Sequence, residues 1–539
     1  MSARIYSRKT PLACDAKLSA LVARTRAVPY NCLRARLPID TSAKVSNVRG
    51  LRFATKQPDV AQLRWRFGTR NFAVPRAGTT EDVPQGSVDE AKTESVDEES
   101  NGNNFGDLMA GITLAFLSIP QGVAYATLAG LPPISGVYAN SVAPVVGATL
   151  GSSRYLQTGV MSMGAMLSGA AVTGLGLAPG SAPFIAASSL LAVLVGCIRV
   201  VLAAVKGGNL VSKVPQTVMH GFTMACVWLV FSTQLPAITG IAGVPPAAAH
   251  MIQKAWWVLV QPQNWSLGPV LLSSVSAAII IGGKRVHALF PGAVVACVLG
   301  CAAAAAGLPV GPVVGAVPSG LPTLQLGALL PVMHLIPGLL FAAGAIAVCC
   351  FAEGAAISSR LAERDQEEWD ANKEVLGSGI AGIASGMFGG LTVSGAISRT
   401  SLAAAAGART RRAAILTGLL VTVFVAAPAG ATAIAMLPKA TLATLVGVAV
   451  LPLLQPTPLL MGNVTDLPED QCGLDMVVVG WLTVVATLAV APKLELGLTI
   501  GLALACLQLT IRKMLPADEM PMLNDMWHRY FKLYTRTAQ

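Results

Sequence analysis

The stretch GGLTVSGAISRTS, from Gly389 to Ser401, decides the fold because it places glycines, hydroxyl groups and an arginine between two hydrophobic segments. An interrupted backbone at membrane depth leaves amide and carbonyl groups that only protein or a water-filled cavity can satisfy. A second short apolar run has a similar lead-in, GSSRYLQTG, at residues 151–159. The two interruptions predict two half-helices that line a common cavity.

The composition places the chain among polytopic membrane proteins. Of its 539 residues, 53% are hydrophobic and only 12% are charged, far from the average of soluble proteins. Apolar runs long enough to cross a bilayer as helices recur from Gly106 to about Lys513. We count fourteen runs, which start near residues 107, 132, 156, 182, 214, 267, 288, 336, 374, 393, 412, 438, 474 and 494.

The basic residues between these runs support an even number of spans. With the N-terminus inside, the inner loops hold thirteen Lys and Arg and the outer loops hold three, Lys254, Lys439 and Lys493. The interrupted runs near 156 and 393 each take third place in a set of seven. We therefore predict an all-α membrane protein of fourteen transmembrane segments, built as a seven-plus-seven inverted repeat with half-helices as spans 3 and 10.

The formal charge of +11 comes mainly from the N-terminus, since sixteen of the 38 Lys and Arg lie in residues 1–78. This Arg-rich, acid-poor segment predicts an organelle transit peptide, and a basic cytosolic tail is the alternative. We favour a chloroplast envelope over a mitochondrial inner membrane or the plasma membrane, and we expect no nucleic-acid partner. Residues 79–105 predict a flexible acidic linker, 106–515 the transport domain and 516–539 a short tail.

The interrupted segments predict an anion site. A half-helix that starts near Gly395 directs the free amides of Gly395, Ala396 and Ser398 at the cavity, and the run from Gly159 to Ser162 does the same in the first half. Hydroxyl and amide side chains could replace the water that an oxyanion loses, although hydroxyls also pack between membrane helices or bond their own backbone. The candidate donors are Gln121, Thr158, Ser162, Ser394 and Ser398.

Two charged residues lie within apolar runs. Arg399 predicts an anion ligand, and its alternative is a structural pair with Glu353 or with backbone carbonyl groups. Glu353 predicts a group that couples transport to H⁺ or another cation, and its alternative is a glutamate that reaches water at the inner end of its helix. We expect no cofactor, no metal site and no enzyme activity, because no nucleophile-elbow, Walker or HExxH pattern occurs.

These motifs resemble the sulfate permease (SulP) family of anion transporters, which are relatives of the uracil-permease-like carriers. The resemblance rests on DLMAGITLAFLSIPQGVAYATLAGLPPISGVYANSVAPVVGATLGSSR (residues 107–154), VPQTVMHGFT, GGLTVSGAISRTSLAAAAGARTRRA, LPKATLATLVGVAV and LELGLTIGLALA, which follow one another over about 400 residues. It implies a core domain that moves against a gate domain in an elevator-like way, and we expect a homodimer. It also implies an anion between spans 3 and 10, with help from Gln121 and Glu353.

The chain departs from the family pattern in three places. Gly159-Val160-Met161 stands where Gly-Pro-Thr is usual, and His220 replaces a more typical basic residue. We also expect the family's STAS domain to be missing after LTIRKMLPADEM. The expected function is secondary transport of an inorganic oxyanion, sulfate first, coupled to H⁺ or to anion exchange. Bicarbonate transport with Na⁺, a passive anion channel and a non-transporting anion sensor are the alternatives.

Overall fold

The computed structural model describes residues 88–208, 214–241, 251–287, 290–454, 474–491 and 493–514. The predicted transit peptide of residues 1–78 and the predicted tail of residues 516–539 lie outside these ranges.

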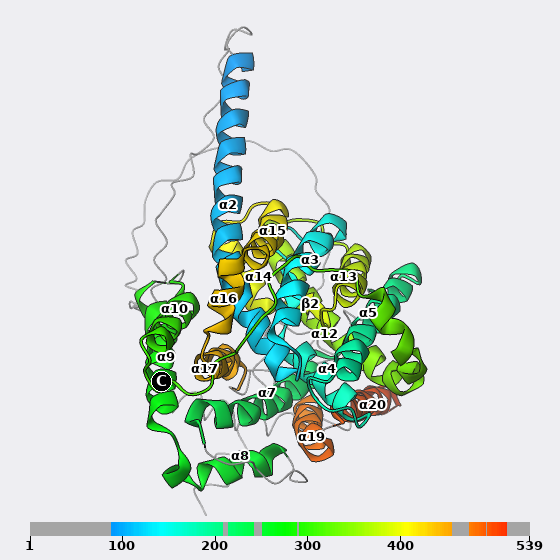
Figure 1. Cartoon of the computed structure of the whole chain (residues 1–539). Helices are drawn as coiled ribbons and strands as arrows, with labels where there is room; N and C mark the ends of the chain where they lie inside the picture. Colours follow the sequence, from blue (N-terminus) through cyan, green and yellow to red (C-terminus); the bar gives the residue numbers. More distant parts are fainter. Residues whose placement is uncertain are drawn as a thin grey trace, which may run out of the picture. The chain divides into compact units, whose positions relative to one another are not determined.

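The described chain is almost entirely helical (Figure 1). The elements are α2 (Val88–Leu128), α3 (Pro133–Leu150), β1 (Thr158–Val160), α4 (Ser162–Thr173), α5 (Ala182–Ala204), α7 (Gln216–Thr239), α8 (Met251–Leu259), α9 (Leu267–Val286), α10 (Gly292–Ala305), α11 (Leu326–Leu329), α12 (Ile336–Asp365), α13 (Ala371–Met387), β2 (Val393–Gly395), α14 (Ile397–Ala405), α15 (Arg412–Ala426), α16 (Pro428–Ala435), α17 (Lys439–Val450), α19 (Leu474–Val490) and α20 (Leu494–Met514), with 3₁₀ turns at Pro262–Asn264, Leu330–Leu335 and Leu451–Leu454.

The structure differs from the expected linker of residues 79–105. Residues 88–105 are helical there and form the start of α2, whereas residues 79–87 lie outside the described residues. This stretch contains good helix formers such as Glu, Ala and Lys, and the span that follows continues the same helix. Low apolar content excluded a buried core in this segment but did not exclude a helix.

Each of the fourteen predicted runs contains a helix of the structure. Four helices of the described chain are long and apolar enough to cross a membrane, or five if the bent pair Arg412–Ala426 and Pro428–Ala435 forms one span. The others are shorter, so the seven-plus-seven count stays a prediction. The described chain is thus a mostly helical membrane protein with several apolar spans.

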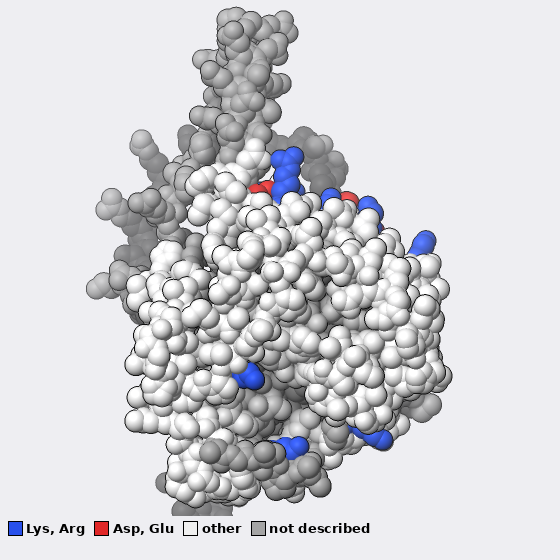
Figure 2. Space-filling view, viewed as in Figure 1, with Lys and Arg blue, Asp and Glu red and all other residues white. Residues whose placement is uncertain are grey.

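The helices pack in two groups. The first group surrounds the two strands and consists of α2, α3, α4, α5, α12, α13, α14 and α15. The second group consists of α7, α9, α10, α17, α19 and α20. The face drawn in Figure 2 has a broad uncharged band, with most of its charged side chains near one end, as expected where lipid covers a protein.

Small residues let helices of the first group approach closely, as is usual in membranes. At the contact of α2 with α3, a Cβ atom added to Gly136 would lie 1.9 Å from the carbonyl oxygen of Gly122. That oxygen belongs to the backbone of a buried helix, so it has little freedom to move. The glycine is therefore required by the spacing of the two helices.

We predict that Gly136→Ala lowers the thermal stability of the detergent-solubilised protein, because overpacking of this kind costs about 1–3 kcal/mol. Fluorescence-detected gel filtration after heating measures the effect. Gly344→Ala is the matched control, since nothing lies within 4 Å of a Cβ atom added to Gly344. Equal melting temperatures for the two variants would contradict the assigned contact.

Candidate functional site

The two interrupted segments meet as a buried two-stranded ladder. Strand β1 pairs antiparallel with β2, with Thr158 opposite Gly395, Gly159 opposite Ser394 and Val160 opposite Val393. All six residues are buried. Because the strands are antiparallel, α4 and α14 leave the ladder in opposite directions, and both helix N-termini lie next to it. The ladder also supplies partners for backbone groups that no helix can satisfy.

Both helices begin later than the sequence predicted. The first intrahelical bonds run from Ala165 N–H to the Met161 carbonyl in α4 and from Thr400 N–H to the Ala396 carbonyl in α14. The amides that precede these bonds belong to residues 162–164 and 397–399. The prediction that Ala396 directs a free amide at a cavity is therefore wrong, because this amide donates to the Gln157 carbonyl at 3.2 Å. Gly395 lies in the ladder, opposite Thr158.

The predicted hydroxyl donors separate into two kinds. The Ser394 hydroxyl donates to the Cys350 carbonyl at 2.7 Å, and Thr158 packs its side chain where a Cβ atom of Gly147 would lie. These two side chains therefore stabilise the packing around the ladder, which is the alternative role that we gave to hydroxyl groups in the sequence. Ser398 is exposed and Ser162 is half-buried, so both remain accessible at the first turns of their helices.

Gln121 and Ser398 line one cavity of about 370 Å³. Its opposite wall comes from α17, from α10 and from the residues just before α10, and is mostly apolar, with Phe290, Ala293, Leu445 and Val448 among its residues. A mainly apolar cavity with a few polar groups is the usual form of a small-ligand site. The structure thus brings together two of the predicted ligands, one from α2 and one from the start of α14.

Arg399 is buried against the ladder. Its Nη2 donates to the Val160 carbonyl at 2.8 Å and its Nη1 donates to Asn140 Oδ1 at 3.1 Å. The same Asn140 oxygen accepts the Val160 amide at 2.9 Å, and the Asn140 amide group donates to the Ser118 carbonyl at 2.8 Å. Arg399 therefore contacts a backbone carbonyl, one of its two predicted alternatives, and forms no pair with Glu353.

Among the residues that the structure describes, none is an acidic partner of Arg399. Within the described part of the chain, the ion pairs are Arg154 with Glu367 and Arg364 with Asp365, both in loops or at helix ends. The guanidinium group lies so close to the ladder that a Cβ atom on Gly159 would be 2.6 Å from its Nη2. A full positive charge and two partial ones, from the helix N-termini, therefore lie at the same place.

Arg199 is a residue that the sequence analysis does not single out. It lies in α5, is fully buried, and its Nη1 donates to the Val393 carbonyl of β2 at 2.7 Å. Its signal in the sequence is a charge inside the apolar run of residues 182–204. Five residues from the end of such a run, however, an arginine is usually one that reaches water.

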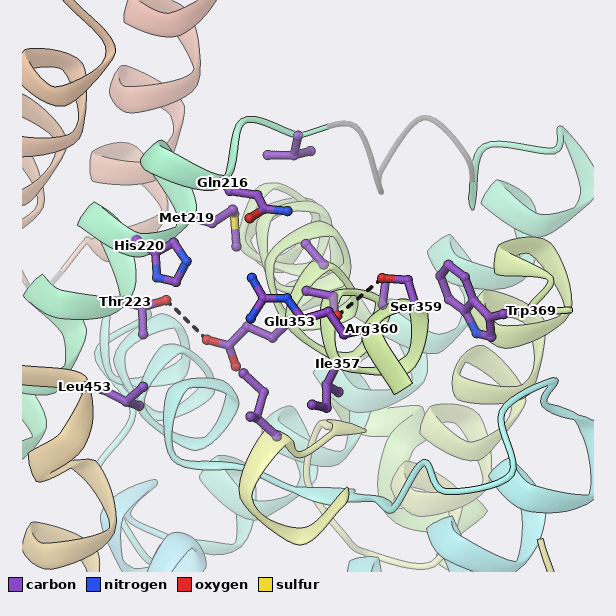
Figure 3. A pocket seen from close by; sticks show the side chains of 15 residues that line it. Gln216, Met219, His220, Thr223, Glu353, Ile357, Ser359, Arg360, Trp369 and Leu453 are labelled. Atoms are coloured by element: carbon purple, nitrogen blue, oxygen red, sulfur yellow. Dashed lines mark hydrogen bonds between the residues drawn. The ribbon is translucent and has the colours of Figure 1, made fainter. Parts of the chain in front are cut away.

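Glu353 lines a second cavity of about 310 Å³ between α7 and α12 (Figure 3). Its carboxylate accepts a hydrogen bond from the Thr223 hydroxyl at 3.1 Å. His220 and Arg360 lie around the same cavity, and so does Ile397 at the start of α14. The structure therefore separates Glu353 from Gln121 and Ser398, which face the other cavity.

This fold and site define a helical membrane protein in which two broken segments join into a positively charged ladder beside a cavity. The chain matches the sulfate permease family over residues 105–463, and it belongs to that family.

Two relatives and one solved structure resemble the chain. It is 33% identical over 360 residues to the probable sulfate transporter MT1781 of Mycobacterium tuberculosis, covering 65% of this chain and 61% of that protein. It is 28% identical over 331 residues to the chloroplastic sulfate transporter 4.1 of Arabidopsis thaliana, covering 58% of this chain and 46% of that protein. The chain thus spans less than two thirds of the length of either relative.

The transmembrane domain of the cyanobacterial bicarbonate transporter BicA has the same fold. It superposes with a TM-score of 0.61 at 21% identity, over 75% of this chain and 97% of that domain.

We predict that Gly159→Ala removes anion binding without unfolding the protein, because its Cβ atom would displace the Arg399 guanidinium group and Asn140 Oδ1. Binding of labelled sulfate to the purified protein measures the loss. Gly164→Ala in α4 is the control, since its nearest neighbour, 3.3 Å away, is the flexible Met161 side chain. Undiminished binding by the Gly159 variant would contradict the role given to this close contact.

Proposed function

We propose that the chain is a secondary transporter of an inorganic oxyanion, with sulfate as the first candidate. The observation that carries the proposal is the ladder, where Arg399 has no acidic partner among the described residues and two helix N-termini begin beside it. A desolvated anion is the ligand that such a field binds. Membership of the sulfate permease family and the two sulfate-transporter relatives support the choice of substrate.

The binding cavity of the proposal is the one that Gln121 and Ser398 line. In the full arrangement, seven spans repeat as seven inverted ones, and the first helix group carries the anion past the second in an elevator-like movement. This movement exposes the cavity to either side, because the cavity has one wall from each group. We also propose that the protein is a homodimer.

The membrane that fits best is the chloroplast envelope. The basic character of residues 1–78 and the chloroplastic relative both support it. Import of a fluorescent fusion into isolated chloroplasts, with recovery of a shortened chain, tests this part separately.

Uptake into liposomes tests the transport function. The purified protein should accumulate labelled sulfate, and the comparison with labelled bicarbonate at fixed pH, with and without Na⁺, decides between the two anions. Bicarbonate is the second candidate because of the BicA fold. Currents too large for a carrier would instead identify an anion channel, and accumulation of neither anion would end the transport proposal.

We predict that Arg399→Lys raises the KM for the anion by at least about tenfold, since lysine retains the charge but cannot make both hydrogen bonds that hold the guanidinium group. Initial uptake rates at varied anion concentration measure KM. Arg154→Lys, in a loop where the side chain is half-exposed, is the control. An unchanged KM would show that Arg399 does not contribute to anion binding.

We predict that Glu353→Gln leaves anion uptake possible but makes it insensitive to a pH gradient, because glutamine keeps the shape and cannot exchange a proton. Uptake with and without an imposed gradient shows the difference. Glu363→Gln is the control, an exposed glutamate on the same helix. A Glu353 variant that still responds to the gradient would exclude this residue as the coupling group.

A further inference from the structure

Each outer edge of the ladder is covered by an arginine. A two-stranded sheet has two open edges, and their carbonyl groups need donors when the sheet is buried. Arg399 donates to Val160 of β1, and Arg199 donates to Val393 of β2. Val160 and Val393 are directly opposite each other in the register. The two guanidinium groups therefore hold one ladder pair from opposite sides.

The second arginine is as deeply buried as the first. Arg199 is 0% exposed and Arg399 is 2% exposed. Besides its bond to Val393, Arg199 donates from Nε to the Ala347 carbonyl of α12 at 3.2 Å. One nitrogen of each group, Nη2 of Arg199 and Nε of Arg399, has no hydrogen-bond partner among the described residues.

No acidic side chain of the described residues forms an ion pair with either arginine. Neither arginine belongs to the ion pairs of the described chain, and Glu353 faces its own cavity, where it bonds to Thr223. Buried charges in a membrane are costly unless something compensates them. The ladder therefore carries two formal positive charges, one at each outer edge.

We propose that Arg199 is a specificity-determining residue, which together with Arg399 adapts the site to an oxyanion with two negative charges, such as sulfate, in preference to one with a single charge. This inference rests on the proposed transport function. The interaction energy of a fixed charge with a ligand is proportional to the charge of the ligand. Arg199 therefore contributes twice as much attraction to a dianion as to a monoanion at the same position.

Arg199 acts through this field and not by contact, because its donors are directed at the carbonyl groups of Val393 and Ala347. Its removal should therefore change the ratio of affinities for the two kinds of anion. A residue that only supports the fold would weaken binding of both kinds equally. This difference separates the two roles.

The test compares Arg199→Lys with Arg199→Gln in the full-length protein. Lysine keeps the charge, whereas glutamine keeps a hydrogen-bond donor for the Val393 carbonyl and loses the charge. Dissociation constants for sulfate and for nitrate, a planar monoanion, are measured by competition against labelled sulfate. We expect the glutamine variant to lower the preference for sulfate at least about tenfold, and the lysine variant to retain it within about threefold. Arg154→Gln, a neutralised arginine outside the ladder, should leave the preference unchanged.

Several results would overturn the inference. Equal weakening of both anions, loss of preference in both variants, or aggregation of both variants would show that Arg199 has a structural role only. A wild-type protein that binds nitrate as tightly as sulfate would also refute it, and this result needs no variant. A wild-type protein that binds no oxyanion at all would refute the proposed transport function instead, so the two failures are distinguishable.

Discussion

The antiparallel pairing of residues 158–160 with 393–395 is the constraint on which the rest of the structure depends. Backbone groups without partners are too costly at membrane depth, so a segment that is broken there needs another broken segment beside it. The pairing brings together two parts of the chain that lie more than two hundred residues apart. It also fixes where α4 and α14 begin, and hence where their positive ends lie.

The ladder pairs backbone groups between the two strands, but the carbonyl groups at its outer edges still need donors. Arginine suits these edges, since its fork of donors reaches a carbonyl group and a second acceptor at once. Arg399 uses Val160 and Asn140, and Arg199 uses Val393 and Ala347. The donors that complete the backbone thus also bring positive charge to the place where the two helix N-termini lie. Structural support and attraction for an anion have the same physical source here.

The sequence predicted the parts of this arrangement that depend on local chemistry. The break at Gly389–Ser401 was visible because glycines and hydroxyls interrupt an apolar run, and Arg399 was visible because a charge there has no route to water. The register of the two strands could not be predicted from the sequence, because the pairing depends on how the surrounding helices pack. For that reason the free amide of Ala396 was predicted wrongly, and the Ser394 hydroxyl has the alternative role of donating to a backbone carbonyl. Arg199 was missed because, near the end of an apolar run, a buried arginine and one that reaches water have the same sequence pattern.

The hydrogen bonds also indicate where the molecule can move. Arg399, Asn140 and Ser118 join α14, α3 and α2 to β1, and Arg199 joins α5 and α12 to β2. Sliding any one of these helices would leave buried charged groups unsatisfied, which costs several kcal/mol. Between the two helix groups, the bond from Thr223 to Glu353 has a net value of only about 1 kcal/mol. In the proposed elevator-like movement, the least costly motion keeps the ladder and its helices together as one body and breaks the bond from Thr223 to Glu353, the proposed proton carrier.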